Sequence, residues 1–232
     1  MLSCKRISKR FGNDTLALEE VSLAVKKGEV FGLLGLNGAG KTTLLRCIVK
    51  LIEPTSGEIF FKTNPLLNQD IQRNFGFLPE NFSPPPNLKA KELLEILTWG
   101  LNLNPARVNL CLEQVGLIEQ RHKSISQYSR GMIQRLGLAL ALLKEPEIII
   151  LDEPTLGLDP LGQAQILSIL VSLNKKGKTV FFSSHTLSQI EKVCHRIAII
   201  NQGRLRFVGD IAEITAKHRS HSLEEAFLKE VS

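Results

Sequence analysis

The sequence predicts an α/β fold with a mostly parallel sheet, an antiparallel β edge at the N-terminus and an inserted helical subdomain. The apolar run Val30–Leu34 reads as a buried strand, and it leads through the glycine-rich segment Gly35–Thr43 into Leu44–Val49, which can continue as a helix. A second run, Glu147–Leu151, is rich in β-branched residues and is followed by acids, as is typical of a central parallel strand. Strand and helix patterns alternate after it, which indicates strands joined by helices.

Strand patterns dominate the chain up to about Pro79. Short apolar pieces at Ile7–Phe11 and Val21–Val25 predict the antiparallel edge. After the helix that follows the glycine-rich segment, strands are expected at Glu58–Phe61 and Phe75–Leu78.

The pattern changes from about residue 82 onward. Three prolines at positions 84–86 stiffen a loop, and apolar residues then recur at helical spacing up to Val115. We therefore expect residues 82–143 to form a helical insertion. The chain is expected to be one domain of residues 1–232, with a core made of residues 1–81 and 144–232.

The second half of the core continues the alternation. The expected elements are a helix at Leu161–Leu173, a strand at Thr179–Ser183, a helix at Ser188–Cys194, strands at Arg196–Ile200 and Arg204–Val208, and a terminal helix at Leu223–Val231. This order favours a parallel sheet wound through helical crossovers.

Composition indicates a globular protein that stays in the cytosol. The 43% hydrophobic content can bury a sizeable core. The longest apolar run, Leu136–Leu143, falls far short of the roughly 20 residues of a membrane-spanning helix, and no signal-peptide pattern follows Met1. The cysteines are widely separated and form no C-x-x-C pair, so we expect small, buried, reduced thiols.

The charge of the chain is +6, and its basic residues are scattered. Without a Lys/Arg block, nucleic acid is not an expected partner. A mild positive balance also suits a protein lying against an anionic membrane face, although ordinary solvated charge is the favoured explanation. His218 and His221 could supply two metal ligands, but no third is in view, so we expect solvated histidines.

The glycine-rich segment fits the phosphate-binding pattern G-x-x-x-x-G-K-[ST] in its required strand-to-helix setting. Its glycines let backbone N–H groups converge on phosphate oxygens at the positive end of the following helix. Lys41 would reach the terminal phosphates, and the Thr42 hydroxyl would bind Mg²⁺. The segment predicts a P-loop NTPase core, with nucleotide-binding residues Asn37, Gly38, Ala39, Gly40, Lys41, Thr42 and Thr43.

Two adjacent acids complete the expected chemistry. Asp152 follows the strand Glu147–Leu151, where a carboxylate can hold Mg²⁺ through water. Glu153 would lie beside the terminal phosphate and could act as a general base toward the attacking water. No N-K-x-D motif is present, which argues against a guanine-specific site.

Further motifs follow in a fixed order along the chain. They are Phe11, Glu80 within Phe77–Glu80, the segment Tyr128–Arg135, the segment Gly157–Asp159, and the pair Ser184 and His185. With the P-loop and Asp152–Glu153, this set resembles the ATP-binding subunit of an ATP-binding cassette (ABC) transporter over essentially the whole chain.

The resemblance implies a role for each motif. Phe11 would stack on adenine, Glu80 would occupy the Q-loop position and contact Mg²⁺, and His185 would be the switch histidine that orients the γ-phosphate or the water. Ser129 and Gly131 would contact the γ-phosphate of a second subunit. ATP and Mg²⁺ are therefore the expected cofactors.

The resemblance also implies partners and a location. Two ATP-binding subunits, identical or homologous, would face each other head to tail with ATP between the P-loop of one and the signature of the other. Hydrolysis would loosen this dimer and drive a separate membrane-spanning permease. The chain would be a peripheral protein on the cytoplasmic side of the cell membrane.

Three departures from the family pattern are visible. Tyr128, Arg130 and Met132 stand at the first, third and fifth places of the usual L-S-G-G-Q signature. Glu80 replaces the usual glutamine. Leu156, where a small or polar residue is common, precedes the segment Gly157–Asp159, which matches the D-loop of the family. The L-P-E and Y-S-R-G-M sequences resemble the branch that serves multidrug-type and copper-processing-type exporters, which favours export over import.

Two alternatives remain open at this level. A soluble ABC-type ATPase acting on ribosomes or DNA usually carries two cassettes or a long coiled-coil insertion, and neither is present. A weakly hydrolysing regulatory nucleotide-binding module is compatible with the altered Q-loop and signature.

Overall fold

The computed structural model describes residues 1–12 and 15–231. The strands are β1 (Leu2–Phe11), β2 (Thr15–Val25), β3 (Val30–Leu34), β4 (Ser56–Phe61), β5 (Asn64–Pro65), β6 (Phe75–Leu78), β7 (Ile148–Leu151), β8 (Thr179–Ser184), β9 (Arg196–Asn201) and β10 (Arg204–Gly209). The α-helices are α1 (Lys41–Ile48), α2 (Asn68–Asn74), α3 (Ala90–Gly100), α4 (Ala106–Gln114), α5 (Arg130–Leu142), α6 (Pro160–Lys175), α7 (Leu187–Val193), α8 (Ile211–His218) and α9 (Leu223–Val231).

The central sheet has the strand order β10-β9-β3-β8-β7-β6. Only the β10–β9 pair is antiparallel, so the expected mostly parallel sheet is confirmed. Because β3, β6, β7 and β8 run in the same direction, the segments that follow them meet at one edge of the sheet. That edge receives the glycine-rich segment, Glu80, Asp152 and His185.

The inner strands read as continuous apolar runs because both faces of the sheet are covered. Every residue of β3, β7 and β8 is buried, including the polar residues at the two ends of β8. Isoleucine at three successive positions of β7 suits this setting, since β-branched side chains pack well on a pleated surface.

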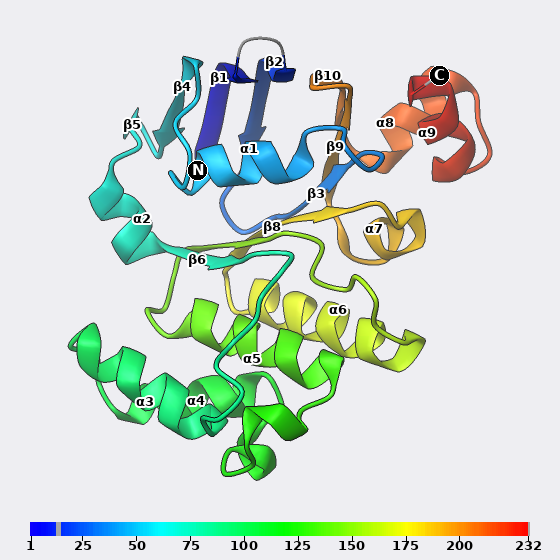
Figure 1. Ribbon diagram of the computed structural model, residues 1–232. Coiled ribbons are helices and arrows are strands. Elements are labelled where there is room, and N and C mark those ends of the chain that lie inside the picture. Colours follow the sequence, from blue (N-terminus) through cyan, green and yellow to red (C-terminus); the bar gives the residue numbers. More distant parts are fainter. Residues whose placement is uncertain (13–14, 232) are drawn as a thin grey trace.

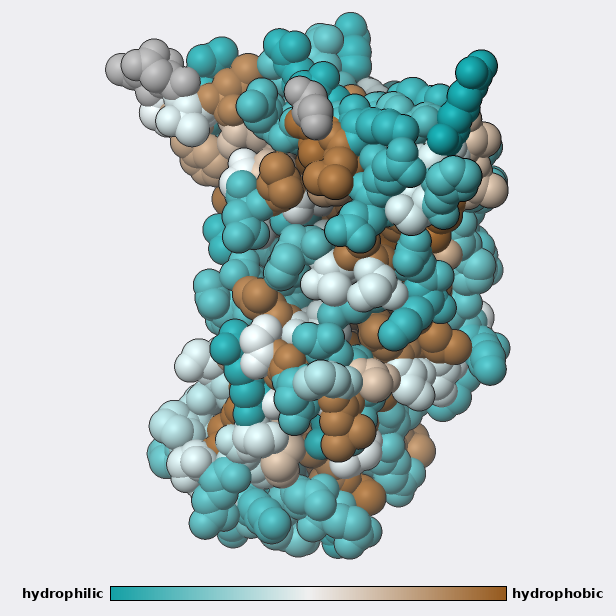
Figure 2. Space-filling view, turned by 90° about the vertical axis from the view of Figure 1, so that its right-hand side faces the viewer, coloured by the Kyte–Doolittle hydropathy of each residue, from teal (hydrophilic) through white to brown (hydrophobic). Residues whose placement is uncertain are grey.

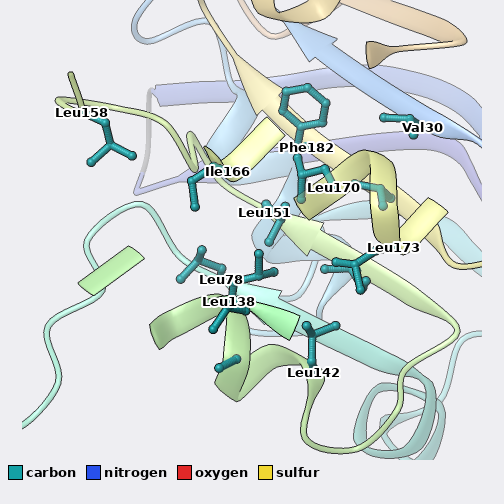
Figure 3. Packing of buried hydrophobic residues seen from close by; sticks show 14 of the residues in the cluster. Val30, Leu78, Leu138, Leu142, Leu151, Leu158, Ile166, Leu170, Leu173 and Phe182 are labelled. Carbon is teal, nitrogen blue, oxygen red and sulfur yellow. The ribbon is translucent and has the colours of Figure 1, made fainter. Parts of the chain in front are cut away.

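Helices α5 and α6 cover one face of the sheet, and α3 and α4 lie beyond α5 (Figure 1). Leu138 of α5 lies beside Leu78 of β6, while Leu170 of α6 lies between Leu151 and Phe182 on the strands (Figure 3). These five side chains are at most 1% exposed. The helical segment and the sheet therefore share one continuous core. Each fully buried residue of this kind contributes about 1.5–3 kcal/mol to the free energy of folding.

The opposite face of the sheet packs on α1, which lies between it and a second, antiparallel sheet (Figure 1). That sheet has the order β2-β1-β4-β5, so the antiparallel edge expected at the N-terminus is a separate layer. Leu44, Leu45 and Ile48 of α1 are fully buried in this core. Phe31 and Phe181 pack edge to face below them, with ring centroids 5.3 Å apart.

Strands dominate the first eighty residues as expected, but the sequence patterns predicted neither α2 within them nor α8 in the tail. Helix α2 buries none of its residues, so it carries no apolar periodicity. Helix α8 had a usable signal. Asp210 Oδ1 accepts from the Glu213 N–H at 2.8 Å, and Glu213 Oε2 accepts from the Asp210 N–H at 2.9 Å, which is a capping box.

The expectation that His218 is solvated is also wrong. Its Nε2 atom lies 2.5 Å from Glu230 Oε2, and the Lys217 ammonium lies 2.8 Å from the same oxygen. The Glu230 side chain is only 9% exposed. These contacts hold α9 against α8. The Asn201 amide at the end of β9 donates to the Val231 carbonyl at 2.8 Å, which also holds α9 to the sheet.

Apolar residues on the face that carries α7 and α9 form separate patches among hydrophilic ones (Figure 2). Within residues 1–12 and 15–231, no helix combines the length and apolar character needed to cross a membrane. All four cysteines are free thiols. Cys4, Cys47 and Cys111 are buried, whereas Cys194 is only partly so. Burial raises the pKa of Cys4 to about 12 and of Cys47 to about 11, which makes both thiols unreactive at neutral pH.

Candidate active site

The glycine-rich segment leaves the carboxyl end of β3 and turns directly into α1 at Lys41. Gly40, with φ 107°, is the N-cap residue, and no side chain caps this helix. A Cβ at Gly40 would lie 2.7 Å from the Ala17 carbonyl oxygen, so both the backbone conformation and the space require glycine. The first N–H groups of α1 are therefore left open for an anion, at the positive end of the helix dipole.

Lys41 is turned back into the loop that precedes it. Its Nζ atom donates to the Gly35 carbonyl at 2.8 Å and to the Leu36 carbonyl at 3.2 Å, and lies 3.3 Å from Glu153 Oε1. Both charged side chains are 7% exposed. The ammonium thus makes two hydrogen bonds and one ion pair with groups of the chain itself, and an entering phosphate would replace some of these contacts.

Glu153 is held by contacts of both carboxylate oxygens and of its backbone N–H. His185 Nδ1 lies 2.9 Å from Glu153 Oε2, and because an ionised carboxylate only accepts, Nδ1 is the protonated ring nitrogen. The Glu153 N–H donates to Ser183 Oγ at 2.8 Å. Glu153 has φ 47°, a left-handed conformation that costs a non-glycine residue about 1–3 kcal/mol and is typical of functional positions.

The two oxygens of Glu153 differ in their bonding. Oε2 accepts from His185, whereas Oε1 is buried and has no hydrogen-bond partner among the described residues, although it lies within ion-pair distance of Lys41. A buried carboxylate oxygen without a hydrogen bond is costly unless a ligand or a water satisfies it. Glu153 Oε1 is therefore the atom available to accept a proton.

Asp152 lies beneath the site at 1% exposure. Its Oδ1 accepts from the Ser183 hydroxyl at 2.7 Å, so Ser183 contacts both acids of the pair. Sequence reasoning missed Ser183. The available signal was the hydroxyl pair at the end of the strand Thr179–Ser184, and pairing of Leu151 with Phe182 places Asp152 opposite Ser183.

A pocket of about 400 Å³ joins most of the predicted residues, and we call it the phosphate pocket. It is lined by Ala17, Leu36, Asn37, Gly38, Ala39, Gly40, Lys41, Thr42, Thr43, Glu80, Glu153, Leu156 and His185. Phe11 and Asp152 do not line it. Phe11 is 44% exposed with the Lys9 ammonium 5.2 Å from its ring centroid, and its contact with adenine stays a prediction.

The predicted signature residues line a different pocket, of about 360 Å³, which we call the signature pocket. Its lining is Ser129, Arg130, Gly131, Arg135, Gly157, Leu158, Asp159, Leu161, Gly162 and Gln165, and it shares no residue with the phosphate pocket. Ser129 is the N-cap of α5, and its hydroxyl accepts from the Met132 N–H at 3.3 Å. Ser129 and Gly131 are therefore apart from the phosphate loop of their own chain.

Arg130 links the signature to the D-loop. A Cβ at Gly157, which has φ 69°, would overlap the Arg130 guanidinium, so this side chain lies directly against Gly157. The Asp159 carboxylate caps α6 by accepting from the Gly162 N–H at 2.7 Å. The arginine at the third signature position thus packs on the D-loop, where the usual glycine could not.

The phosphate pocket offers oxygen ligands that suit Mg²⁺. The Thr42 hydroxyl and the Glu80 carboxylate line the pocket, and Asp152 lies at the adjoining strand end. Mg²⁺ prefers oxygen donors and is usually held by one or two carboxylates together with substrate phosphates and water, so this donor set fits the ion.

Comparison with known proteins places the chain in one family. The sequence profile described as ABC transporter matches residues 18–156. An uncharacterised ABC transporter ATP-binding protein of Nostoc sp. is 43% identical over 90% of this chain and 64% of its own length. The bacitracin transport ATP-binding protein BcrA of Enterococcus faecalis is 38% identical over 96% of this chain and 73% of its length. The lantibiotic transport ATP-binding protein SrtF of Streptococcus pyogenes is 35% identical over 88% and 89%.

Solved structures give the same result. A dimeric ATP-binding cassette in a post-hydrolysis state bound to ADP and Pi has a TM-score of 0.81 and 28% identity, covering 90% of this chain and 98% of its own. An ATP-binding subunit of an ABC transporter has a TM-score of 0.87 and 30% identity, covering 99% and 98%. The chain spans 64% and 60% of the lengths of two cyanobacterial relatives. By profile, sequence and structure, the chain belongs to the ABC transporter family, as an ATP-binding domain.

Proposed function

We propose that the chain binds ATP with Mg²⁺ in the phosphate pocket and hydrolyses it. The observation that carries this proposal is the buried Oε1 atom of Glu153, which faces a phosphate-binding loop and has no hydrogen-bond partner among the described residues. Oε1 accepts a proton from a water, the water oxygen bonds to the γ-phosphorus, and the bond to the β-phosphate bridge breaks to give ADP and phosphate. Bound Mg²⁺ supplies positive charge to the phosphate oxygens during this step.

His185 orients this base. Its Nδ1–H holds Glu153 Oε2, which leaves Oε1 free for the water, and its imidazole lines the pocket where the γ-phosphate lies. Lys41 exchanges its contact with Glu153 for the phosphates when ATP enters, and this exchange releases the carboxylate for catalysis. ATP binding and base activation are thus one event.

The working unit is a head-to-tail dimer. The signature pocket shares no lining residue with the phosphate pocket, so Ser129 and the first N–H groups of α5 can meet a γ-phosphate only on another subunit. Solved relatives with the same fold are dimers, one of them with ADP and Pi bound. The bridging γ-phosphate holds the dimer closed, and its removal opens it.

The dimer drives export through a separate membrane-spanning subunit and is held by it at the cytoplasmic membrane face. The resemblance to the exporter branch supports this direction, and two relatives are named for bacitracin and lantibiotic transport. The docking surface is the loop after Glu80 together with Trp99, which is 87% exposed. Phe82 and Leu88 of this loop pack against the core but are only partly buried, so both still present apolar surface to the membrane subunit.

Purified protein tests the hydrolytic part of the proposal. We expect Mg²⁺-dependent release of phosphate from ATP, lost in chelator and stimulated by a membrane subunit that co-purifies from detergent-solubilised membranes. A protein that binds ATP but releases no phosphate, with or without that subunit, would instead be a regulatory binding module.

Cross-linking tests the docking surface. Single cysteines at the exposed residues Ser83 and Asn87 should cross-link to the membrane subunit in an ATP-dependent way, whereas a control cysteine at exposed Glu224 on α9 should not. Cross-links from position 224 alone would place the docking surface on the C-terminal helices.

A further inference from the structure

A buried network of polar side chains lies behind the phosphate pocket and is not part of the chemistry described above. Its centre is Gln189, in the first turn of α7, which is 4% exposed. Gln189 Oε1 accepts from Thr155 Oγ1 at 2.6 Å and from Ser184 Oγ at 3.3 Å. Gln189 Nε2 donates to Gln163 Oε1 at 3.1 Å. One amide therefore ties three separate segments together.

Two of these segments carry the catalytic pair. Thr155 is two residues beyond Glu153, and the Leu156 N–H closes the intervening turn by donating to the Glu153 carbonyl at 3.0 Å. Ser184 directly precedes His185, and its hydroxyl also accepts from the Thr186 N–H at 3.0 Å. Thr155 and Ser184 are at most 3% exposed, and Gln189 Oε1 is the acceptor to which each of their hydroxyls donates. Gln189 thus fixes the backbone on both sides of the Glu153–His185 contact.

The third segment leads to the D-loop. Gln163 Nε2 donates to the Leu158 carbonyl at 3.0 Å. Gly157, the neighbouring residue, is covered from the other side by the Arg130 guanidinium of the signature. The D-loop therefore has a contact on each side. Arg130 contacts it from the signature pocket, and Gln163 links it to Gln189.

We propose that Gln189 is a positioning residue for hydrolysis, which sets the Glu153–His185 pair and the D-loop in register with each other. The inference rests on the proposed ATPase function and adds a residue that none of the sequence motifs contains. When a second subunit closes onto the signature pocket, it presses on the D-loop. Gln163 and Gln189 then transmit the position of the D-loop to the end of β8, which His185 follows. A buried, fully bonded network of this kind permits one arrangement rather than several.

The geometry separates this role from ATP binding. Gln189, Gln163, Thr155 and Ser184 do not line the phosphate pocket. Loss of the network therefore misplaces the base and the histidine without removing a contact to the nucleotide. A misplacement of this size lowers kcat by roughly tenfold to a hundredfold, with KM changed by less than about twofold.

Three variants divide the network. Gln189→Leu removes every bond of the amide. Gln189→Glu keeps an acceptor for Thr155 and Ser184 but offers no donor to Gln163, and Gln163→Leu cuts the same branch from the other end. We expect the largest loss of kcat in Gln189→Leu and smaller losses in the other two. In the double variant Gln163→Leu/Gln189→Glu the loss should be less than the sum of the two single losses, because both changes break the bond between Gln189 and Gln163.

Asn174→Leu is the matched control. Asn174 lies at the far end of α6, and its amide donates to the Gly28 and Lys178 carbonyls at 2.8 and 3.1 Å. This variant also loses amide hydrogen bonds and should lower the melting temperature, but its kcat should equal that of the wild type. If Gln189→Leu lowers the melting temperature as the control does and leaves kcat unchanged, Gln189 is merely structural and the inference is wrong.

Amide hydrogen exchange tests the same inference without turnover. Gln189→Leu should speed exchange at residues 155–163 and 184–187 together, while Gln163→Leu should speed it only at residues 157–163. Faster exchange confined to α7 would overturn the proposal. An inactive wild-type protein would contradict the proposed function alone, because the exchange pattern still decides whether Gln189 joins the two segments.

Discussion

The phosphate pocket and the signature pocket are similar in volume but differ in how their charges are used. In the phosphate pocket the cation and the acid are both buried and already bonded, since Lys41 lies against Glu153 and Glu153 accepts from His185. In the signature pocket Arg130 is exposed, and within the described residues no hydrogen bond or ion pair of its guanidinium is found. Its contact is with the bare backbone of Gly157.

Each pocket lacks a part of the hydrolytic site that the other pocket holds. The phosphate pocket has the base and the phosphate loop, and the signature pocket has a capped helix N-terminus that can meet an anion. Among the described residues that line the signature pocket, Asp159 is the only acid, and its carboxylate already accepts from the Gly162 N–H. A complete hydrolytic site therefore needs one pocket from each of two subunits.

Glu153→Gln should cause the largest loss of turnover of the variants considered. The amide keeps the shape of the carboxylate but cannot accept a proton, so turnover should fall by about 10²–10⁴-fold while ATP still binds. Because the γ-phosphate then persists, size-exclusion chromatography with ATP and Mg²⁺ should show a stable dimer. A variant that stays monomeric and retains turnover would show that Glu153 is not the base.

Lys41→Ala should act on binding rather than on the base. It removes the charge-assisted hydrogen bonds to the phosphates, which are worth about 1.5–3 kcal/mol each, so ATP affinity should fall by roughly a hundredfold. Titration with a fluorescent ATP analogue measures this loss. An affinity equal to that of the wild type would exclude Lys41 from the nucleotide site.

Mixing two inactive variants should test directly whether the pockets complete each other. A subunit with Lys41→Ala keeps its signature pocket, and a subunit with Ser129→Phe keeps its phosphate pocket. In a random mixture half of the dimers are mixed and each has one intact composite site, so about a quarter of wild-type turnover should return. If the mixture stays as inactive as its components, the two pockets do not combine across a head-to-tail interface.

The residues of the phosphate pocket could largely be predicted because they lie in local motifs. Lys41 and Thr42 follow from spacing within one loop, and Asp152 and Glu153 follow from the end of one strand. His185 was placed with them only through the resemblance to ABC ATP-binding subunits, and the parallel strands, which end at the same edge of the sheet, bring it there. Their roles in hydrolysis stay predictions, although the structure brings Lys41, Glu153 and His185 into contact.

The contacts that sequence reasoning missed depend on register and on packing between distant elements. Ser183 reaches both acids only because β7 and β8 pair with Leu151 opposite Phe182. The contact of Arg130 with Gly157 and the bonds of Gln189 join helices and loops that no motif spacing relates. Helix α2 was missed for another reason, since a short helix with no fully buried residue and only Ile71 packed against the core has no apolar pattern to detect.

Gly157→Ala should impair hydrolysis from the side of the signature pocket. The added methyl group would displace the Arg130 guanidinium and strain a residue with φ 69°, so we expect turnover to fall by roughly tenfold. Arg130→Ala in the same chain removes the overlap and should recover part of the loss, whereas Arg130→Ala alone tests the guanidinium itself. Equal turnover in Gly157→Ala and wild type would show that the arginine and the D-loop are not coupled.

The smallest effect is expected outside both pockets, at the contact between α8 and α9. Burial raises the pKa of Glu230, but hydrogen bonds from Lys217 and His218 outweigh this and hold the pKa below its ordinary value near 4.5. A carboxylate whose pKa is lowered on folding stabilises the protein fully above the unfolded-state pKa, and this stabilisation is lost as the pH falls through the folded-state pKa. Acidification below about pH 4.5 should therefore weaken the contact between α9 and α8.

Glu230→Gln separates this contact from catalysis. At pH 7 it should lower the free energy of unfolding by about 1 kcal/mol, or the melting temperature by about 2–4 °C, because the charge-assisted bonds to Lys217 and His218 are weakened. Between pH 7 and pH 3 the stability of the variant should fall less than that of the wild type, since one acid-sensitive group is gone. Neither helix lines the phosphate pocket or the signature pocket, so kcat and KM at pH 7 should be unchanged. A fall in kcat in this variant would mean that α9 acts on the switch through α7, which it contacts, and the two pockets would no longer account for hydrolysis by themselves.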